Sequence, residues 1–223
     1  MAAPRPGDVV YTFEGPLEEA VVESRPNRFL VRLADGRLCH LHDPGRLPEL
    51  IYRGSRVLVR PTRGARTSCS VTAAWGGRGW VVTDSRIHSD VASRFLPEGA
   101  RREVRVGSSR LDFAFDDTYV EVKGCTLVVD GVALFPDAPT ERGARHVREL
   151  ARLRAEGHGA VLFFLVMRDD ARCLAPNAAT DPAFASAFWE AVGAGVEVWV
   201  KAFSLRGADV IYVGDLPLCG APA

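Results

Sequence analysis

Residues 110–127 read RLDFAFDDTYVEVKGCTL, and their apolar and polar side chains alternate on both sides of the Asp116-Asp117 turn. This alternation about a central turn predicts an antiparallel hairpin. Successive side chains of a strand point to opposite faces, so Glu121 and Lys123 share one face of the hairpin. Asp112 stands between two apolar residues and is expected on the same outward face. The stretch therefore brings two carboxylates and one ammonium group together on one surface of a sheet.

The chemistry expected of this group is that of a divalent cation beside a phosphodiester. Carboxylate oxygens without imidazole or thiolate neighbours favour Mg²⁺ or Mn²⁺ over zinc. Such a cation polarises a phosphate and lowers the pKa of a bound water. We predict that Asp112, Glu121 and the carbonyl of Val122 hold the metal. Asp112 and Glu121 are then catalytic together with Lys123, which positions the water and stabilises transition-state charge. A solvated cross-strand charge cluster without chemistry is the open alternative.

The basic residues are unevenly placed and nearly all are arginine. The net charge of the chain is zero, but residues 25–66 hold ten arginines against three acids. A local surplus of positive charge attracts phosphate whatever the charge of the whole chain. We therefore predict that Arg25, Arg28 and Arg32 contact a nucleic-acid backbone, with DNA as the partner and RNA as the alternative. The other interpretation is that the chain is rich in arginine overall and that these arginines lie on exposed strand faces without binding a ligand.

The composition, 47% hydrophobic and 25% charged, is that of a globular protein, and the pattern along the chain divides it in two. Residues 1–83 hold short apolar segments about ten residues apart, which predicts a small β-barrel. Residues 84–223 show a mixed α/β pattern. The strands expected in the first part are 9–13, 20–22, 29–31, 38–41, 57–59 and 70–75. The elements expected in the second part are helices at 89–95, 137–156 and 181–189 and strands at 103–106, 111–115, 119–127, 160–166, 195–203 and 209–213.

Further nucleic-acid contacts are expected on both parts of the chain. Arg142, Arg145 and His146 fall in the first turns of the long helix after the hairpin, where we predict contact with the phosphate being cut or with the backbone. Phe29 and Tyr52 are candidates for stacking on bases, as aromatic residues of small barrels do. A solvated outer helix face, and a core position for Phe29, are the open alternatives.

The five cysteines show no regular spacing and no Cys-x-x-Cys pair. This odd number favours reduced thiols and a cytoplasmic protein over a disulfide framework. The first eight residues lack the apolar stretch of a signal peptide, and the longest apolar run, 160–167, is too short to span a bilayer. We expect no membrane partner. Self-association as a homo-oligomer is left open.

Several of these stretches resemble the sugar fermentation stimulation protein A family (SfsA). The similar strings are SRLDF at 109–113, YVEVK at 119–123, FPDAPTERGARH at 135–146, RFLV at 28–31 and HLHDPGRL at 40–47. The likeness runs over nearly the whole chain in the same order. The turn that is usually Cys-Pro-Asn-Thr-Gly in the family stands here as the shorter His42-Asp43-Pro44-Gly45.

The resemblance implies an OB-type barrel followed by a PD-(D/E)xK restriction-endonuclease-like domain of α/β or α+β class. It implies sequence-independent DNA binding and a regulatory role in sugar, notably maltose, metabolism. Carried over by position, Asp112 and Glu121 are the metal-binding carboxylates and Lys123 is the lysine of the nuclease motif. Many such nucleases add a glutamate from the first helix, where this chain offers Asp90. Three functions remain open. The protein is an active nuclease, a DNA-binding protein with a nuclease-like site, or a module with a vestigial site that binds an acidic protein.

Overall fold

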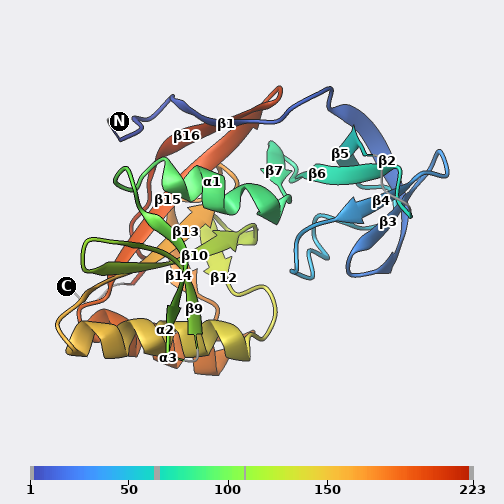
Figure 1. Ribbon diagram of the computed structural model, residues 1–223. Helices are drawn as coiled ribbons and strands as arrows, with labels where there is room; N and C mark the ends of the chain where they lie inside the picture. The colour runs from blue at the N-terminus through green and yellow to red at the C-terminus, as the bar shows by residue number, and fades with distance from the viewer. Residues whose placement is uncertain (1–2, 63–65, 108, 221–223) are drawn as a thin grey trace.

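The computed structural model describes residues 3–62, 66–107 and 109–220, and it arranges them as a small barrel beside a larger α/β domain (Figure 1). The barrel strands are β2 (Glu18–Asn27), β3 (Leu30–Leu33), β4 (Leu38–Leu41), β5 (Arg56–Pro61) and β6 (Cys69–Trp75). β4 pairs in parallel with β6, which closes the order β2-β3-β4-β6-β5 back onto β2. This five-stranded Greek-key closure is the OB topology, as the sequence predicted. A short strand, β7 (Trp80–Val82), continues beside β6.

The strand predicted at 9–13 forms but does not belong to the barrel. As β1 (Val9–Thr12), it pairs antiparallel with β16 (Asp209–Asp215) at the edge of the large sheet (Figure 1). Val10 and Phe13 then pack into the core of the second domain. The placement in the barrel was wrong because alternation predicts a strand and says nothing about which sheet edge it joins.

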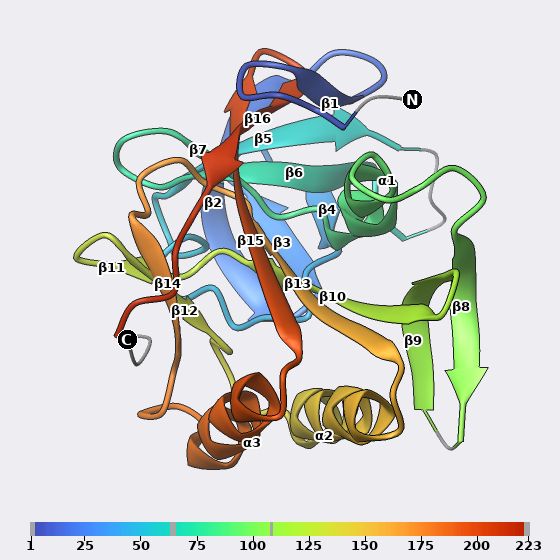
Figure 2. The ribbon, with the colours of Figure 1, turned by 90° about the vertical axis from the view of Figure 1, so that its left-hand side faces the viewer.

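The second domain is built on a seven-stranded sheet with the order β1-β16-β15-β13-β10-β9-β8. Its remaining strands are β8 (Arg101–Val106), β9 (Ser109–Phe115), β10 (Thr118–Cys125), β13 (Gly159–Val166) and β15 (Glu197–Arg206). The 3₁₀ turn η1 (Ser85–Ile87) and α1 (His88–Ser93) cover one face, and α2 (Glu141–Ala155) and α3 (Pro182–Gly193) cover the other (Figure 2). Strand β13 lies between both layers, which explains its uninterrupted apolar sequence.

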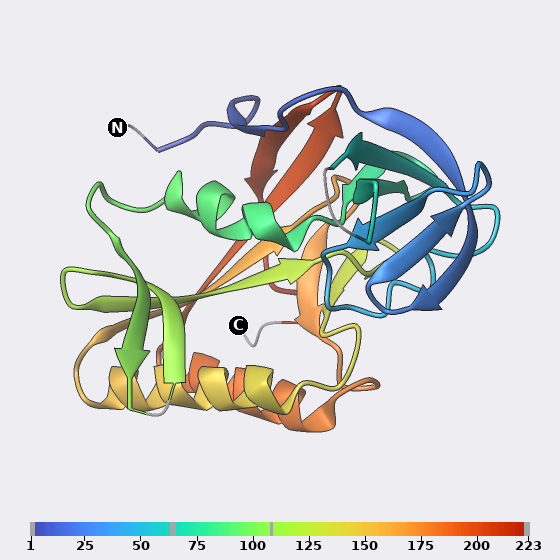
Figure 3. The same ribbon diagram turned by 45° about the vertical axis from the view of Figure 1, so that its right-hand side comes forward.

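The segment after the hairpin differs from the prediction. β10 ends at Cys125, and a separate three-stranded sheet follows, formed by β11 (Val128–Val129), β12 (Val132–Phe135) and β14 (Cys173–Pro176). Helix α2 starts four residues after the predicted Asp137, because Thr140 is its N-cap and accepts a hydrogen bond from Gly143 N at 3.0 Å. Asp137 instead accepts a hydrogen bond from Arg46 N at 2.9 Å and so joins the segment before α2 to the barrel (Figure 3).

Four of the five cysteines form disulfides, so the prediction of reduced thiols was wrong. Cys39–Cys69 links β4 to β6 where the barrel closes, and Cys173–Cys219 ties the C-terminal segment to β14. Cys125 is the free thiol and is buried. The sequence separations of 30 and 46 carry no signal for this pairing, which depends on strands that only the fold brings together. Within the described residues, no helix is long and apolar enough to cross a membrane.

The disulfides predict a defined thiol count. Protein denatured without reductant should show one thiol that reacts with Ellman's reagent, and the Cys125→Ala variant should show none. Replacing both Cys39 and Cys69 by alanine should lower the free energy of unfolding by about 2–4 kcal/mol, because the unfolded chain regains loop entropy. Urea unfolding followed by circular dichroism measures this loss. Five reactive thiols in the wild type would contradict the pairing.

Candidate active site between the two domains

The predicted metal and catalytic residues line one cavity of about 410 Å³ between the domains. Asp112 enters it from β9, and Glu121 and Lys123 enter it from β10. The barrel contributes Arg28 and the turn at 43–45. The segment before α2 and the first turn of that helix line the remaining side. The cavity therefore has walls from both domains.

The two strands of the hairpin separate where the site begins. β9 and β10 pair from Thr118 to Val120, and beyond that point the Asp112 carboxylate takes the place of the β9 backbone. Its Oδ2 accepts a hydrogen bond from Val122 N at 2.7 Å. The N–H and C=O of one strand residue point to the same side, so the Val122 carbonyl also faces Asp112. The Asp112 carboxylate and the Val122 carbonyl thus meet at the open edge of β10, in a partly buried position rather than on the exposed surface that the sequence predicted.

Glu121 is held through one of its two oxygens. Its side chain is buried at 3% exposure, and Oε1 forms an ion pair with Lys123 Nζ and a hydrogen bond with His146 Nδ1 at 2.5 Å. Arg142 Nε donates to His146 Nε2 at 3.4 Å, which leaves the imidazole proton on Nδ1 for Glu121. Oε2 is buried and has no hydrogen-bond partner. The carboxylate is therefore fixed in orientation with one oxygen unused.

The electrostatics of the two carboxylates differ. Burial and, to a smaller extent, the neighbouring Glu121 charge raise the pKa of Asp112 to about 6, against the opposing effects of the Val122 N–H and the Lys123 charge. Burial also acts to raise the pKa of Glu121, but the hydrogen bond from His146 and the charge of Lys123 outweigh it and hold that pKa below its ordinary value. At neutral pH both groups are ionised against one ammonium, so the site attracts a cation.

The helix residues predicted to contact phosphate separate into two kinds. Arg142 and Arg145 are exposed on the first turns of α2, and Arg142 lines the cavity. His146 is buried at 2% exposure behind Glu121. In this conformation its ring supports the carboxylate, and the two arginines are the groups that a phosphate could reach.

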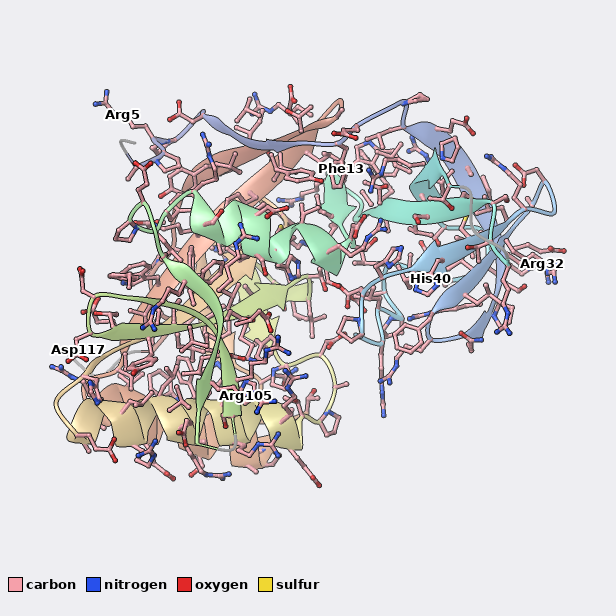
Figure 4. All side chains as sticks on the ribbon, viewed as in Figure 1. Arg5, Phe13, Arg32, His40, Arg105 and Asp117 are labelled. Atoms are coloured by element: carbon pink, nitrogen blue, oxygen red, sulfur yellow. A yellow bond between two sulfur atoms is a disulfide. The ribbon has the colours of Figure 1, made fainter. Side chains whose placement is uncertain are left out.

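The barrel residues predicted to bind nucleic acid also differ in availability. The Arg25 guanidinium turns inward and donates to the carbonyls of Arg28 at 2.9 Å and Gly45 at 3.2 Å, which fixes the loop. Arg28 is exposed and lines the cavity. Arg32 is half-buried and lies at the outer end of the barrel, farther from the second domain than His40 (Figure 4).

Phe29 is 41% exposed, so the alternative of a core position is wrong for this residue. Part of the arginine surplus is neutralised by acids outside the basic segment, in the pairs Arg37–Glu18, Arg56–Glu19 and Arg60–Asp84. Arg28 and Arg32 form no ion pair with any described residue. Arg63 lies outside the described residues.

Asp137, which the sequence placed only at the start of a helix, joins the domains by accepting the hydrogen bond from Arg46 N, and Asp43 fixes the barrel turn beside it. Asp43 is buried at 8% exposure and accepts a hydrogen bond from Gly45 N at 2.7 Å. Burial raises the pKa of Asp43 to about 6. Together with the bond from Arg46 N to Asp137, this contact seats the barrel turn against the segment before α2. The sequence signal that could have predicted this contact was the Asp43-Pro44-Gly45 turn, which departs from the family pattern.

The first helix contributes a histidine in place of an acid. Asp90 is exposed and pairs with Arg102 at 2.8 Å, so its carboxylate is directed away from Asp112 and Glu121. His88 lines the cavity instead, and burial lowers its pKa to about 4, which keeps the ring neutral. Its ring occupies the space that any side chain at Gly124 would need. This close approach explains the glycine immediately after Lys123.

The fold and the junction define a class of two-domain protein, an OB barrel followed by a restriction-endonuclease-like α/β domain. Residues 24–83 match the family model described as the SfsA N-terminal OB domain, and residues 83–208 match the sugar fermentation stimulation protein RE domain. The chain therefore belongs to the sugar fermentation stimulation protein family.

Similar proteins cover nearly the whole chain. A sugar fermentation stimulation protein homolog from Sulfolobus acidocaldarius is 55% identical over 95% of this chain and 94% of its own length. One from Sulfurisphaera tokodaii is 54% identical over 95% of this chain and 94% of its own. The solved structure of Pyrococcus furiosus SfsA in complex with Ca²⁺ is 28% identical, with a TM-score of 0.86 over 95% of this chain and 99% of that chain.

Replacing Asp112 by asparagine should stabilise the metal-free protein in alkaline solution. The folded-state pKa of Asp112 is raised from 3.8 to about 6, so its contribution to stability is fully present below about pH 4 and is lost as the pH rises through 6. Asparagine keeps an acceptor for Val122 N–H and carries no charge. We expect the free energy of unfolding to exceed that of wild type by about 1–3 kcal/mol near pH 8 and to match it near pH 4.

Urea unfolding in the presence of EDTA measures this difference at both pH values. Asp90→Asn is the matched control, because that acid is exposed on the surface, and it should change stability by less than about 0.5 kcal/mol. An Asp112→Asn variant that is less stable than wild type near pH 8 would show that the ionised Asp112 carboxylate does not destabilise the folded protein.

Proposed function

We propose that this protein binds DNA without sequence preference and holds, between its domains, a Mg²⁺ or Mn²⁺ centre that hydrolyses phosphodiesters. The observation that carries this proposal is the Glu121 carboxylate. Lys123 and His146 fix its Oε1, and its Oε2 is buried without a partner. A buried acceptor left unpaired costs about 1–3 kcal/mol, and more when it is charged. A cation removes that cost.

The donor set fits a hard divalent cation. Asp112, Glu121 Oε2 and the Val122 carbonyl are all oxygens on one edge of β10. Within the described residues, no group of three or more His, Cys, Asp or Glu side chains is placed to hold a metal ion, so the proposed donor set has only two carboxylates. This incomplete set suits Mg²⁺, which keeps several waters and shares its coordination with substrate phosphate. The solved structure of the Pyrococcus relative is a complex with Ca²⁺, which is a hard divalent cation, and this supports the proposal of such a cation here.

A bound cation would polarise the scissile phosphate and lower the pKa of an attacking water. The protein residues supply the remaining functions. Lys123 lies beside the carboxylates and lines the cavity, so its ammonium can orient the water and stabilise charge on the phosphate. His146 holds Glu121 in place from behind and does not touch the substrate.

DNA binding is proposed to use the arginines around the cavity, Arg28 and Arg142, and their outer neighbours Arg32 and Arg145. Guanidinium contacts to phosphate position a backbone and carry no base sequence. The regulatory role in sugar metabolism rests on membership of the family alone.

Cleavage should depend on the cation and on Lys123. Purified protein with Mg²⁺ or Mn²⁺ should nick DNA, and Lys123→Gln should slow cleavage by roughly 10²–10³-fold, because one charge-stabilising donor is lost. Asp112→Asn should lose both cleavage and the increase in melting temperature caused by Mn²⁺. The assay follows fluorescent single-stranded and double-stranded DNA and RNA on denaturing gels.

Lys201→Gln is the matched control, because Lys201 is the chain's other lysine and its ammonium pairs with Asp215 at 2.6 Å outside the cavity. It should cleave as fast as wild type. Equal cleavage by wild type, Lys123→Gln and Asp112→Asn would identify a contaminating nuclease. DNA binding without any cleavage would support the DNA-binding part of the proposal and contradict its catalytic part.

DNA affinity should fall steeply with salt. Four phosphate contacts predict a loss of roughly 100-fold between about 50 and about 200 mM salt, because bound counterions are released from DNA. Arg28→Gln and Arg142→Gln should each reduce the slope of log K against log salt by about 1. Fluorescence anisotropy in EDTA measures this slope without cleavage. Affinity that is indifferent to salt would contradict the proposal.

A further inference from the structure

The outer surface of the barrel carries a row of rings beside the cavity. The guanidinium of Arg28 lies over the Phe29 ring, 5.1 Å from its centroid. The Phe29 and His40 rings are parallel to within 6°, with centroids 6.3 Å apart. The His40 and His42 rings follow at 4.2 Å. Phe29, His40 and His42 therefore form a ring row beside β4, and Phe29 is its most exposed ring.

Both ends of the ring row adjoin the cavity wall. Arg28, which covers the Phe29 ring, lines the cavity. At the other end, Ser85 Oγ donates to the carbonyl of His42, and Ser85 also lines the cavity. His42 is further fixed by a hydrogen bond between its Nε2 and Ser70 Oγ at 3.1 Å. The ring row is thus anchored and runs along the barrel side of the proposed active site.

The charges around the ring row suit a phosphate backbone. Arg28 and Arg32 have no carboxylate partner among the described residues. Arg32 lies on the same face of the β3–β4 ladder as His40, because Leu30 pairs with His40 and Arg32 stands two residues further along β3. Partly exposed rings next to guanidinium groups without a carboxylate partner are the elements that bind single strands, in which bases stack on rings while cations follow the phosphates.

We propose that the ring row binds unpaired bases, so that the preferred ligand is single-stranded nucleic acid whose backbone passes Arg28 into the cavity. This inference rests on the proposed function of the cavity and adds the strandedness of its substrate. In a duplex the bases are stacked on one another and their faces are not available to Phe29. Stacking on one aromatic side chain strengthens the binding of an unpaired base roughly tenfold, so the ring row discriminates between the two forms.

The test compares two substitutions of one residue in the full-length protein. Phe29→Leu keeps apolar bulk and removes the ring, whereas Phe29→Tyr keeps the ring. Binding of fluorescein-labelled oligothymidine and of a blunt duplex is measured by anisotropy in EDTA. We expect Phe29→Leu to weaken single-strand binding roughly tenfold and Phe29→Tyr to change it less than about twofold. Neither variant should change duplex binding by more than about twofold.

His40→Ala removes the second ring and provides an independent measurement, with an expected loss of single-strand affinity and unchanged duplex affinity. Melting temperatures of all variants confirm that they are folded. Wild-type affinity of Phe29→Leu for oligothymidine, or an equal loss for both ligands, overturns the inference. Binding of duplex but not of single strands by the wild type overturns it while the proposed function stands. Failure to bind either nucleic acid overturns both.

Discussion

Among the residues that the structure describes, none pairs its backbone with β10 on the β9 side beyond Val120, and the Asp112 carboxylate takes that place by accepting the Val122 N–H. A main-chain donor at the open edge of a buried sheet needs an acceptor, because an unpaired amide costs free energy comparable to a lost hydrogen bond. The side chain that meets this need also brings a charge into a region covered by both domains. The separation of the two strands, the cavity and the grouping of carboxylates thus share one origin.

This arrangement makes the site a source of instability in the absence of a ligand. The pKa of Asp112 is raised to about 6 by burial, and Glu121 Oε2 has no partner although Lys123 and His146 hold Oε1. Charged groups gathered in this way are tolerated where a protein gives up stability for function. The helix α2 supports the group, since it covers the sheet face on which Glu121 lies and supplies the imidazole that orients it.

Both domains contribute residues to one cavity. The Asp43 turn and the Asp137 contact to Arg46 seat the barrel against the segment that leads into α2. Arg28 belongs both to the ring row of the barrel and to the cavity wall. A ligand that contacts Arg28 would therefore lie next to the cavity that Asp112 and Glu121 also line.

The local pattern of the sequence determined the barrel strands, the hairpin, the buried strand β13 and the presence of helices α2 and α3, because alternation, turn residues and caps act between near neighbours. It also placed Asp112, Glu121 and Lys123 on adjacent strands. Only the tertiary structure decided that β1 pairs with β16, that four cysteines are joined, and that His146 supports Glu121 from within. It likewise directed Asp90 outward and His88 to the cavity. The reason is physical: the partner of a strand edge, a thiol or a buried carboxylate comes from a distant part of the chain, and periodicity carries no information about which part that is.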